Sequence, residues 1–96
     1  MGWADSYIRT LQESPTVTFR PRGNSMTPHI KSGQQVTVER CETPEVGDIV
    51  LCRVRGKQYL HFVRTTGKRG YLIGNAHGKM NGWTGTIYGK VIQVGP

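Results

Sequence analysis

Apolar and polar residues alternate in several short segments of the chain, and a period of two residues is typical of strands that bury one face. Turns rich in glycine, proline and asparagine separate these segments. The pattern predicts about six strands, at residues 17–20, 35–40, 49–54, 58–64, 71–73 and 86–94. The glycine- and asparagine-rich stretch at residues 74–85 is expected to be a loop. The fold class predicted is mainly β, a coiled and partly closed antiparallel sheet.

A different spacing marks the N-terminus, where the apolar residues fall on one face of a helix. They are Trp3, Tyr7, Ile8 and Leu11. Asp5 suits the first turn of that helix, and Pro15 ends it. We predict a short amphipathic helix within residues 1–15 and a single β domain at residues 16–96. The helix either docks on this domain, which we favour, or is an arm that binds a partner.

Length and charge limit the function. A chain of 96 residues allows one small domain and excludes doubly wound nucleotide enzymes and (β/α)₈ barrels. The net charge is +7, yet all six acidic residues precede residue 49. Residues 49–96 carry eight bases and no acid. That half therefore supplies no carboxylate to a catalytic site, and its charge permits an acidic partner.

Other residue types indicate the class of protein. Cys41 and Cys52 are expected to be a pair of reduced, buried thiols rather than a disulfide, since no secretory signal is recognisable. The three histidines lack zinc-like spacing, and we expect no metal or other cofactor. No apolar run approaches the ~20 residues of a transmembrane helix. We predict a soluble, cytoplasmic protein without a transmembrane segment.

Two residues could carry chemistry. Ser25 lies in a turn bounded by Gly23 and Pro28, and His61 lies within an apolar strand. A serine in a turn is usually structural, and a core histidine is usually satisfied by a backbone carbonyl. The functional alternative is that a neutral His61 removes the proton of Ser25, which activates the hydroxyl as a nucleophile.

Three segments support the functional alternative together. They are Gly23-Asn24-Ser25-Met26-Thr27-Pro28, Val46-Gly47-Asp48-Ile49-Val50 and Tyr59-Leu60-His61-Phe62-Val63. Their order and spacing resemble serine peptidases of the signal peptidase and LexA/UmuD-like repressor superfamily, over about residues 17–94. The resemblance implies the fold of that superfamily. The base is lysine in most of its members and histidine in archaeal and reticulum signal peptidases, so this chain resembles the Ser/His branch.

The resemblance implies a role for each matching residue. Ser25 would be the nucleophile, and His61 the general base and later the general acid. Met26 and Pro28 would shape the turn that presents the serine. The backbone N–H of Ser25 would donate to the oxyanion. Signal peptidases can add a hydroxyl two residues before the nucleophile, whereas Gly23 offers only its N–H.

The chain departs from signal peptidases where these carry an acid near the base. Residues 74–83 have amide and imidazole groups there instead. The residue that orients His61 would be Asn75, His77 or Asn81, unless the base has no such partner. An equally weighted alternative is that these asparagines only close turns. Asparagine can orient an imidazole but stabilises an imidazolium less than a carboxylate does. We expect a Ser/His dyad of moderate activity, with a base kept neutral by the surrounding cations.

The predicted function is a serine endopeptidase that acts on a protein or peptide substrate. The alternative is a catalytically weak module of the same fold that holds an extended peptide or protein partner. Nucleic-acid binding is a third and disfavoured hypothesis, because the lysines and arginines are scattered along the chain. Residues 1–24 contain no Ala-Gly or Cys-Gly, so self-cleavage of the repressor type is not expected. Members of the superfamily often dimerise, and the resemblance makes a homodimer a further hypothesis.

Overall fold

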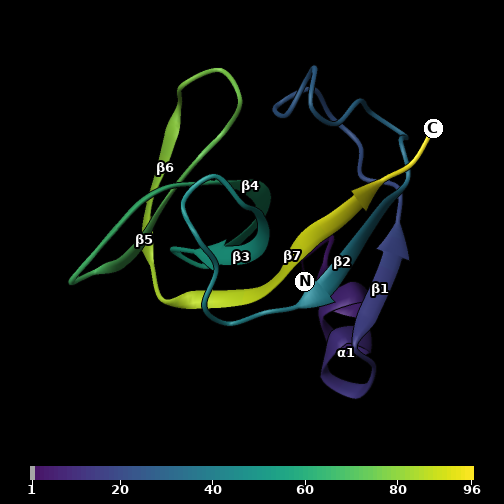
Figure 1. Ribbon diagram of the computed structural model, residues 1–96, viewed down its shortest axis with the longest axis horizontal. Coiled ribbons are helices and arrows are strands. Elements are labelled where there is room, and N and C mark those ends of the chain that lie inside the picture. Colours follow the sequence, from purple (N-terminus) through teal and green to yellow (C-terminus); the bar gives the residue numbers. More distant parts are fainter. Residues whose placement is uncertain (1) are drawn as a thin grey trace.

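The computed structural model describes residues 2–96, in which one helix precedes seven strands (Figure 1). The elements are α1 (Asp5–Glu13), β1 (Thr16–Phe19), β2 (Val36–Arg40), β3 (Ile49–Val54), β4 (Lys57–Gly67), β5 (Gly70–Gly74), β6 (Met80–Thr84) and β7 (Thr86–Val94). All strands form one antiparallel sheet in the order β1-β2-β7-β3-β4-β5-β6. The mainly β fold is therefore confirmed. The sheet coils without closing, because β1 and β6 remain its two edges.

The prediction of a continuous loop at residues 74–85 was wrong. Strand β6 lies within it and pairs with β5 from Gly74↔Met80 to Tyr71↔Thr84. Four of its five residues are half-buried and one is exposed. The strand therefore lacks the in-out alternation that reveals a strand in sequence. The correction matters because β6 carries Asn81.

The core consists of two clusters on the coiled sheet. One joins α1 to β1, β2, β3 and β4, and includes the fully buried Val36, Val38 and Leu51. The other lies among β3, β4, β5 and β7, around Val50 and Ile73. Because the strands are apolar on the faces that meet, burial of these side chains is the main force that holds the sheet coiled.

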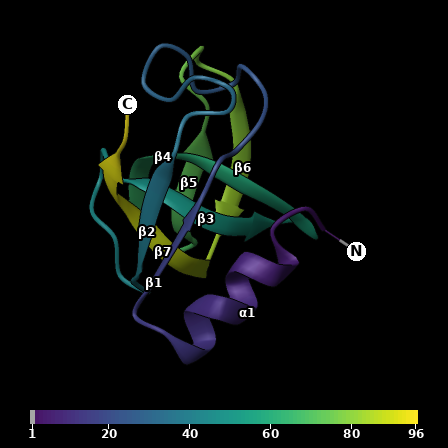
Figure 2. The same cartoon turned by 90° about the vertical axis from the view of Figure 1, so that its right-hand side faces the viewer.

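Helix α1 packs along the β1 side of the sheet (Figure 2). Ile8 and Leu11 are its buried residues, at the spacing that the sequence predicts for one helix face. The helix begins at Asp5, so that Trp3, the first residue of the predicted apolar face, precedes it. It is docked on the sheet, as in the favoured alternative. No helix within residues 2–96 is long and apolar enough to cross a membrane.

Gln58 fixes the start of the chain to β4. Its buried side-chain carbonyl accepts the N–H of Ala4 at 2.9 Å, and its amide donates to Asp5 Oδ1. The indole N–H of Trp3 donates to the backbone carbonyl of Gln58 at 3.1 Å. These bonds hold the N-terminal residues beside the part of β4 that leads to His61.

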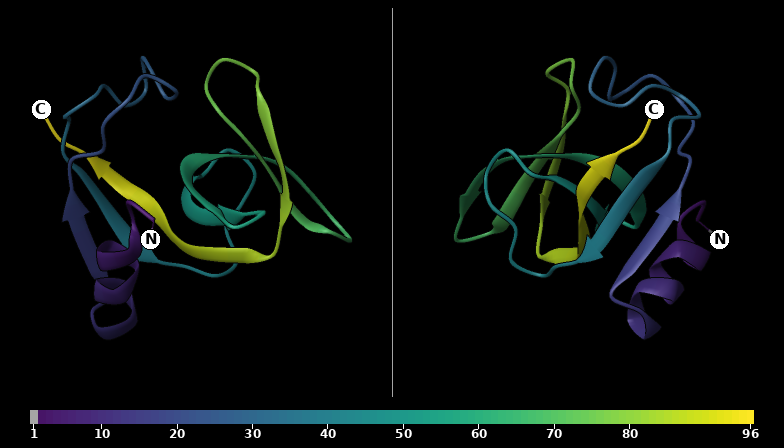
Figure 3. Two further views of the ribbon diagram at one scale, coloured as in Figure 1. Left: turned by 180° about the vertical axis from the view of Figure 1, so that it is seen from behind. Right: turned by 45° about the vertical axis from the view of Figure 1, so that its right-hand side comes forward.

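The β1–β2 and β5–β6 connections lie at the same end of the sheet, as every view shows (Figures 1 to 3). One joins β1 to β2 across residues 20–35 and carries Ser25. The other joins β5 to β6 across residues 75–79. The Ala76 N–H donates to the carbonyl of Ser25 at 3.0 Å, which ties the two connections together. Both cysteines are free thiols, as predicted, but only Cys52 is buried and Cys41 is half-buried.

We predict that Gly89→Ala lowers the free energy of unfolding by about 1–3 kcal/mol. A Cβ at Gly89 would lie 2.6 Å from the Glu39 carbonyl oxygen and 2.6 Å from Val38 Cγ1, with Leu11 at 3.1 Å. Gly85→Ala is the control, since a Cβ there meets nothing within 4 Å. Urea unfolding of both variants measures the difference. Equal stability of the two would contradict this close packing of β7 against β2 and α1.

Candidate active site

The loop at residues 20–35 exposes Ser25 by burying its neighbours. Met26 and Ile30 are only 5% and 3% exposed and belong to the core cluster of α1. Gly23 has a φ of +113°, a conformation that favours glycine. The peptide bond before Pro28 is cis. The buried pair therefore anchors the turn, and Ser25 lies at its surface.

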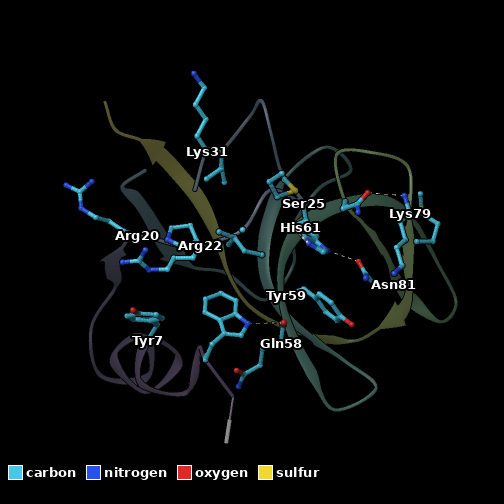
Figure 4. Close-up of a pocket in the computed structure, with 18 residues that line it drawn as sticks. Tyr7, Arg20, Arg22, Ser25, Lys31, Gln58, Tyr59, His61, Lys79 and Asn81 are labelled. Atoms are coloured by element: carbon cyan, nitrogen blue, oxygen red, sulfur yellow. Dashed lines mark hydrogen bonds between the residues drawn. The ribbon is translucent and has the colours of Figure 1, made fainter. Parts of the chain in front are cut away.

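His61 lies in β4, opposite Val50 of β3, and its side chain is 7% exposed. The structure brings Ser25 Oγ to 3.0 Å from His61 Nε2 (Figure 4). The other ring nitrogen, Nδ1, lies 2.7 Å from Asn81 Oδ1. Three side chains from the β1–β2 loop, β4 and β6 thus form one hydrogen-bonded row.

The chemistry of Asn81 fixes the tautomer of the imidazole. An amide oxygen only accepts hydrogen bonds, so His61 Nδ1 must carry the proton. In the neutral ring Nε2 is then an acceptor, and the hydroxyl of Ser25 donates to it. This is the arrangement in which an imidazole can receive a serine proton.

Burial lowers the pKa of His61 below its usual 6.5, and the weaker effect of the Asn81 hydrogen bond raises it. The imidazole is therefore neutral near pH 7. The sequence predicts the same direction, but from the charges of the surrounding lysines and arginines. The physical cause is instead desolvation, because the His61 side chain is buried in the sheet. The tilted ring of Tyr59 packs beside it, with 5.1 Å between the ring centroids.

The other two residues considered for orienting the base do something else. Asn75 Oδ1 accepts the N–H groups of His77 and Lys79, at 2.9 and 3.0 Å, and so closes the β5–β6 turn. The imidazole Nε2 of His77 donates to the Asn24 carbonyl at 3.0 Å. Within residues 2–96, neither Asn75 nor His77 is hydrogen-bonded to His61.

The two backbone N–H groups considered as oxyanion donors also differ. Gly23 N–H donates to Ser32 Oγ at 3.0 Å, so it is engaged inside the loop. Ser25 N–H has no acceptor among residues 2–96. Of the two, only Ser25 N–H is free to donate to a bound carbonyl oxygen.

The pattern of the Peptidase S24-like family matches residues 3–84, which include Ser25, His61 and Asn81. The chain belongs to that family. None of the curated proteins matches it. The match extends from the N-terminal helix through β6, so all three residues of the hydrogen-bonded row lie within the S24-like region.

The serine and histidine of this S24-like domain open onto a cavity of about 690 Å³. Met26, Ile30 and Leu60 give it an apolar lining, and Trp3 and Tyr7 line it on the side of α1. Sequence reasoning missed the cationic lining of the cavity, although Arg20 and Arg22 lie close before Ser25. No group of metal ligands occurs within residues 2–96.

We predict that Asn81→Asp raises the pKa of His61, because a carboxylate stabilises the imidazolium more than an amide does. Asn75→Asp is the matched control: it adds the same charge to the same part of the chain without touching the ring. NMR titration of the His61 imidazole measures both. An equal shift in the two variants would refute the assignment of Asn81 as the group that orients the base.

Proposed function

We propose that this S24-like domain is a serine peptidase with Ser25 as nucleophile and His61 as general base. The observation that carries the proposal is the 3.0 Å contact between Ser25 Oγ and His61 Nε2, with Nδ1 held by Asn81. Membership of a peptidase-like family supports it. The substrate would be a protein or peptide that enters the cavity beside these residues.

In the first step Ser25 Oγ attacks the carbonyl carbon of the scissile bond. The hydroxyl proton passes to His61 Nε2 as the new C–O bond forms. Negative charge develops on the carbonyl oxygen, and the N–H of Ser25 donates to it. The Nδ1 proton stays on the ring, where it continues to donate to Asn81.

In the second step His61 acts as an acid and returns its proton to the departing amine. The C–N bond breaks and leaves an acyl group on Ser25. A water molecule then attacks this ester while His61 Nε2 accepts its proton. When that proton moves to Ser25 Oγ, the product leaves as a carboxylic acid and the hydroxyl is restored.

The weak point of this mechanism is the imidazolium that forms in each step. A carboxylate would stabilise the cation by its charge, whereas Asn81 offers only the dipole of an amide. Burial also lowers the pKa of the ring. The geometry thus favours transfer of the proton to His61, whereas the resulting positive charge is only weakly stabilised. Both effects together fit the moderate activity expected from the sequence.

The lack of a carboxylate beside His61 also supports a second function, which is binding without turnover. If the imidazolium is too poorly stabilised, the cavity would hold an extended peptide that Ser25 does not cleave. Covalent labelling of the serine separates the two functions, because it requires an activated nucleophile rather than mere binding.

We predict that a fluorescent fluorophosphonate labels the protein and that Ser25→Ala abolishes labelling. His61→Ala should slow labelling by about 10²-fold or more, because the general base is lost. Ser6→Ala is the control, since Ser6 lies on the exposed face of α1. In-gel fluorescence over time measures the rates. Absence of wild-type labelling, or equal labelling of Ser25→Ala, would overturn the peptidase and favour the binding module.

The labelling rate should depend on pH through His61. The reaction needs the neutral ring, so the rate is full above the pKa of His61 and falls as the pH drops through it. Because burial lowers that pKa, the midpoint should lie below 6.5. A midpoint above 6.5 would contradict the buried, neutral base.

A further inference from the structure

Four basic residues line the cavity around Ser25, and no aspartate or glutamate lines it. They are Arg20, Arg22, Lys31 and Lys79, and all four side chains are exposed. Figure 4 shows Lys79 on one side of Ser25 and the other three on the opposite side. The cavity is therefore positively charged at both ends of the candidate catalytic row.

These charges are not neutralised by the protein. Within residues 2–96 the ion pair is Arg53 with Asp5, at 3.9 Å, and neither residue lines this cavity. Arg22, Lys31 and Lys79 thus have no carboxylate partner in the part of the chain that the structure describes. Repulsion among like charges is a cost in the free protein, and an anionic ligand would remove it.

Arg20 is held in place by neutral groups. Its guanidinium donates to the Gly33 carbonyl at 3.0 Å and to Gln35 Oε1 at 3.3 Å. These bonds fix the planar group but leave its charge and its remaining N–H groups available. A pre-organised guanidinium is well suited to bind a carboxylate, since little side-chain entropy is lost on binding.

We propose that this cavity selects extended peptides with acidic side chains flanking an apolar centre. The proposal rests on the peptidase or peptide-binding function above and adds its substrate class. Arg20, Arg22 and Lys31 would contact the main acidic cluster on one side of Ser25. Lys79 would contact an acidic side chain on the other side.

The apolar lining favours a peptide over a nucleic acid. Met26, Ile30 and Leu60 lie in the same cavity as the cations, and they offer no partner for a phosphate backbone. A peptide supplies both parts, with apolar side chains at the centre and carboxylates toward the ends. A nucleic acid would match the charge and the aromatic side chains of Trp3, Tyr7 and Tyr59, but not the aliphatic part of the lining.

The test measures binding separately from catalysis, in the Ser25→Ala protein. A dye-labelled peptide with an alanine-rich centre and glutamates at one end is titrated with protein at low salt, followed by fluorescence anisotropy. A second peptide carries the glutamates at the other end. In both cases the reference replaces every glutamate by glutamine. We expect at least one acidic peptide to bind about tenfold more tightly than its reference, a difference that added salt reduces.

Matched variants locate the binding. R20Q/R22Q/K31Q should remove most of the preference for glutamate while the glutamine peptide binds as before. The control R9Q/K68Q/R69Q also removes two arginines and one lysine, but from exposed positions outside the cavity. It should keep the preference. Arg22→Gln alone covers the risk that loss of Arg20 disturbs the loop, and should weaken acidic binding severalfold.

The outcomes are distinct. Equal binding of acidic and glutamine peptides, absence of measurable binding of either acidic peptide, or an equal loss in both triple variants would overturn the proposal. So would tighter binding of a single-stranded oligonucleotide of equal charge. If acid preference holds while fluorophosphonate labelling fails, the acidic ligand stands and the peptidase does not. If labelling succeeds while the preference is absent, the peptidase stands and this inference is wrong.

Discussion

A buried imidazole with a partner on each nitrogen is the constraint on which the rest of this site depends. His61 lies in the interior of the sheet, and a polar ring there is costly unless its nitrogens are hydrogen-bonded. Ser25 and Asn81 provide these partners. Because they come from a loop and from an edge strand, the fold must bring the β1–β2 and β5–β6 connections to one end of the sheet. The Ala76–Ser25 and His77–Asn24 bonds hold them there.

The same burial determines which chemistry is open to the site. It keeps the imidazole neutral, while the Asn81 amide oxygen fixes Nδ1 as the donor, so that Nε2 faces the serine hydroxyl. With no acid beyond Asp48 in the sequence, the ring is oriented by an amide. Orientation and charge stabilisation, which one carboxylate provides together in a Ser-His-acid triad, are separated here. Asn81 provides the first, and the second depends on the substrate and solvent that reach the cavity.

The sequence predicted elements whose side chains alternate and missed the one whose side chains do not. Strand β3 has the predicted bounds, and α1 has its buried residues at the predicted spacing. Strand β6 escaped because pairing of its backbone with β5, rather than burial of one face, defines it. For the same reason the choice among Asn75, His77 and Asn81 stayed open. Only a sheet register shows which of them faces a residue 20 positions earlier.

The charge of the cavity depends on which residues the fold brings together, and not on the net charge of either half of the chain. The acid-free half contributes Lys79 to the cavity, whereas Arg20, Arg22 and Lys31 come from the half that is nearly neutral overall. The acids of that first half lie outside the cavity, so a neutral stretch of sequence still yields a cationic groove. An acidic peptide bound there would bring carboxylates near the row that lacks one. It would then lower the cost of the imidazolium at His61, so recognition and proton transfer would depend on the same charges.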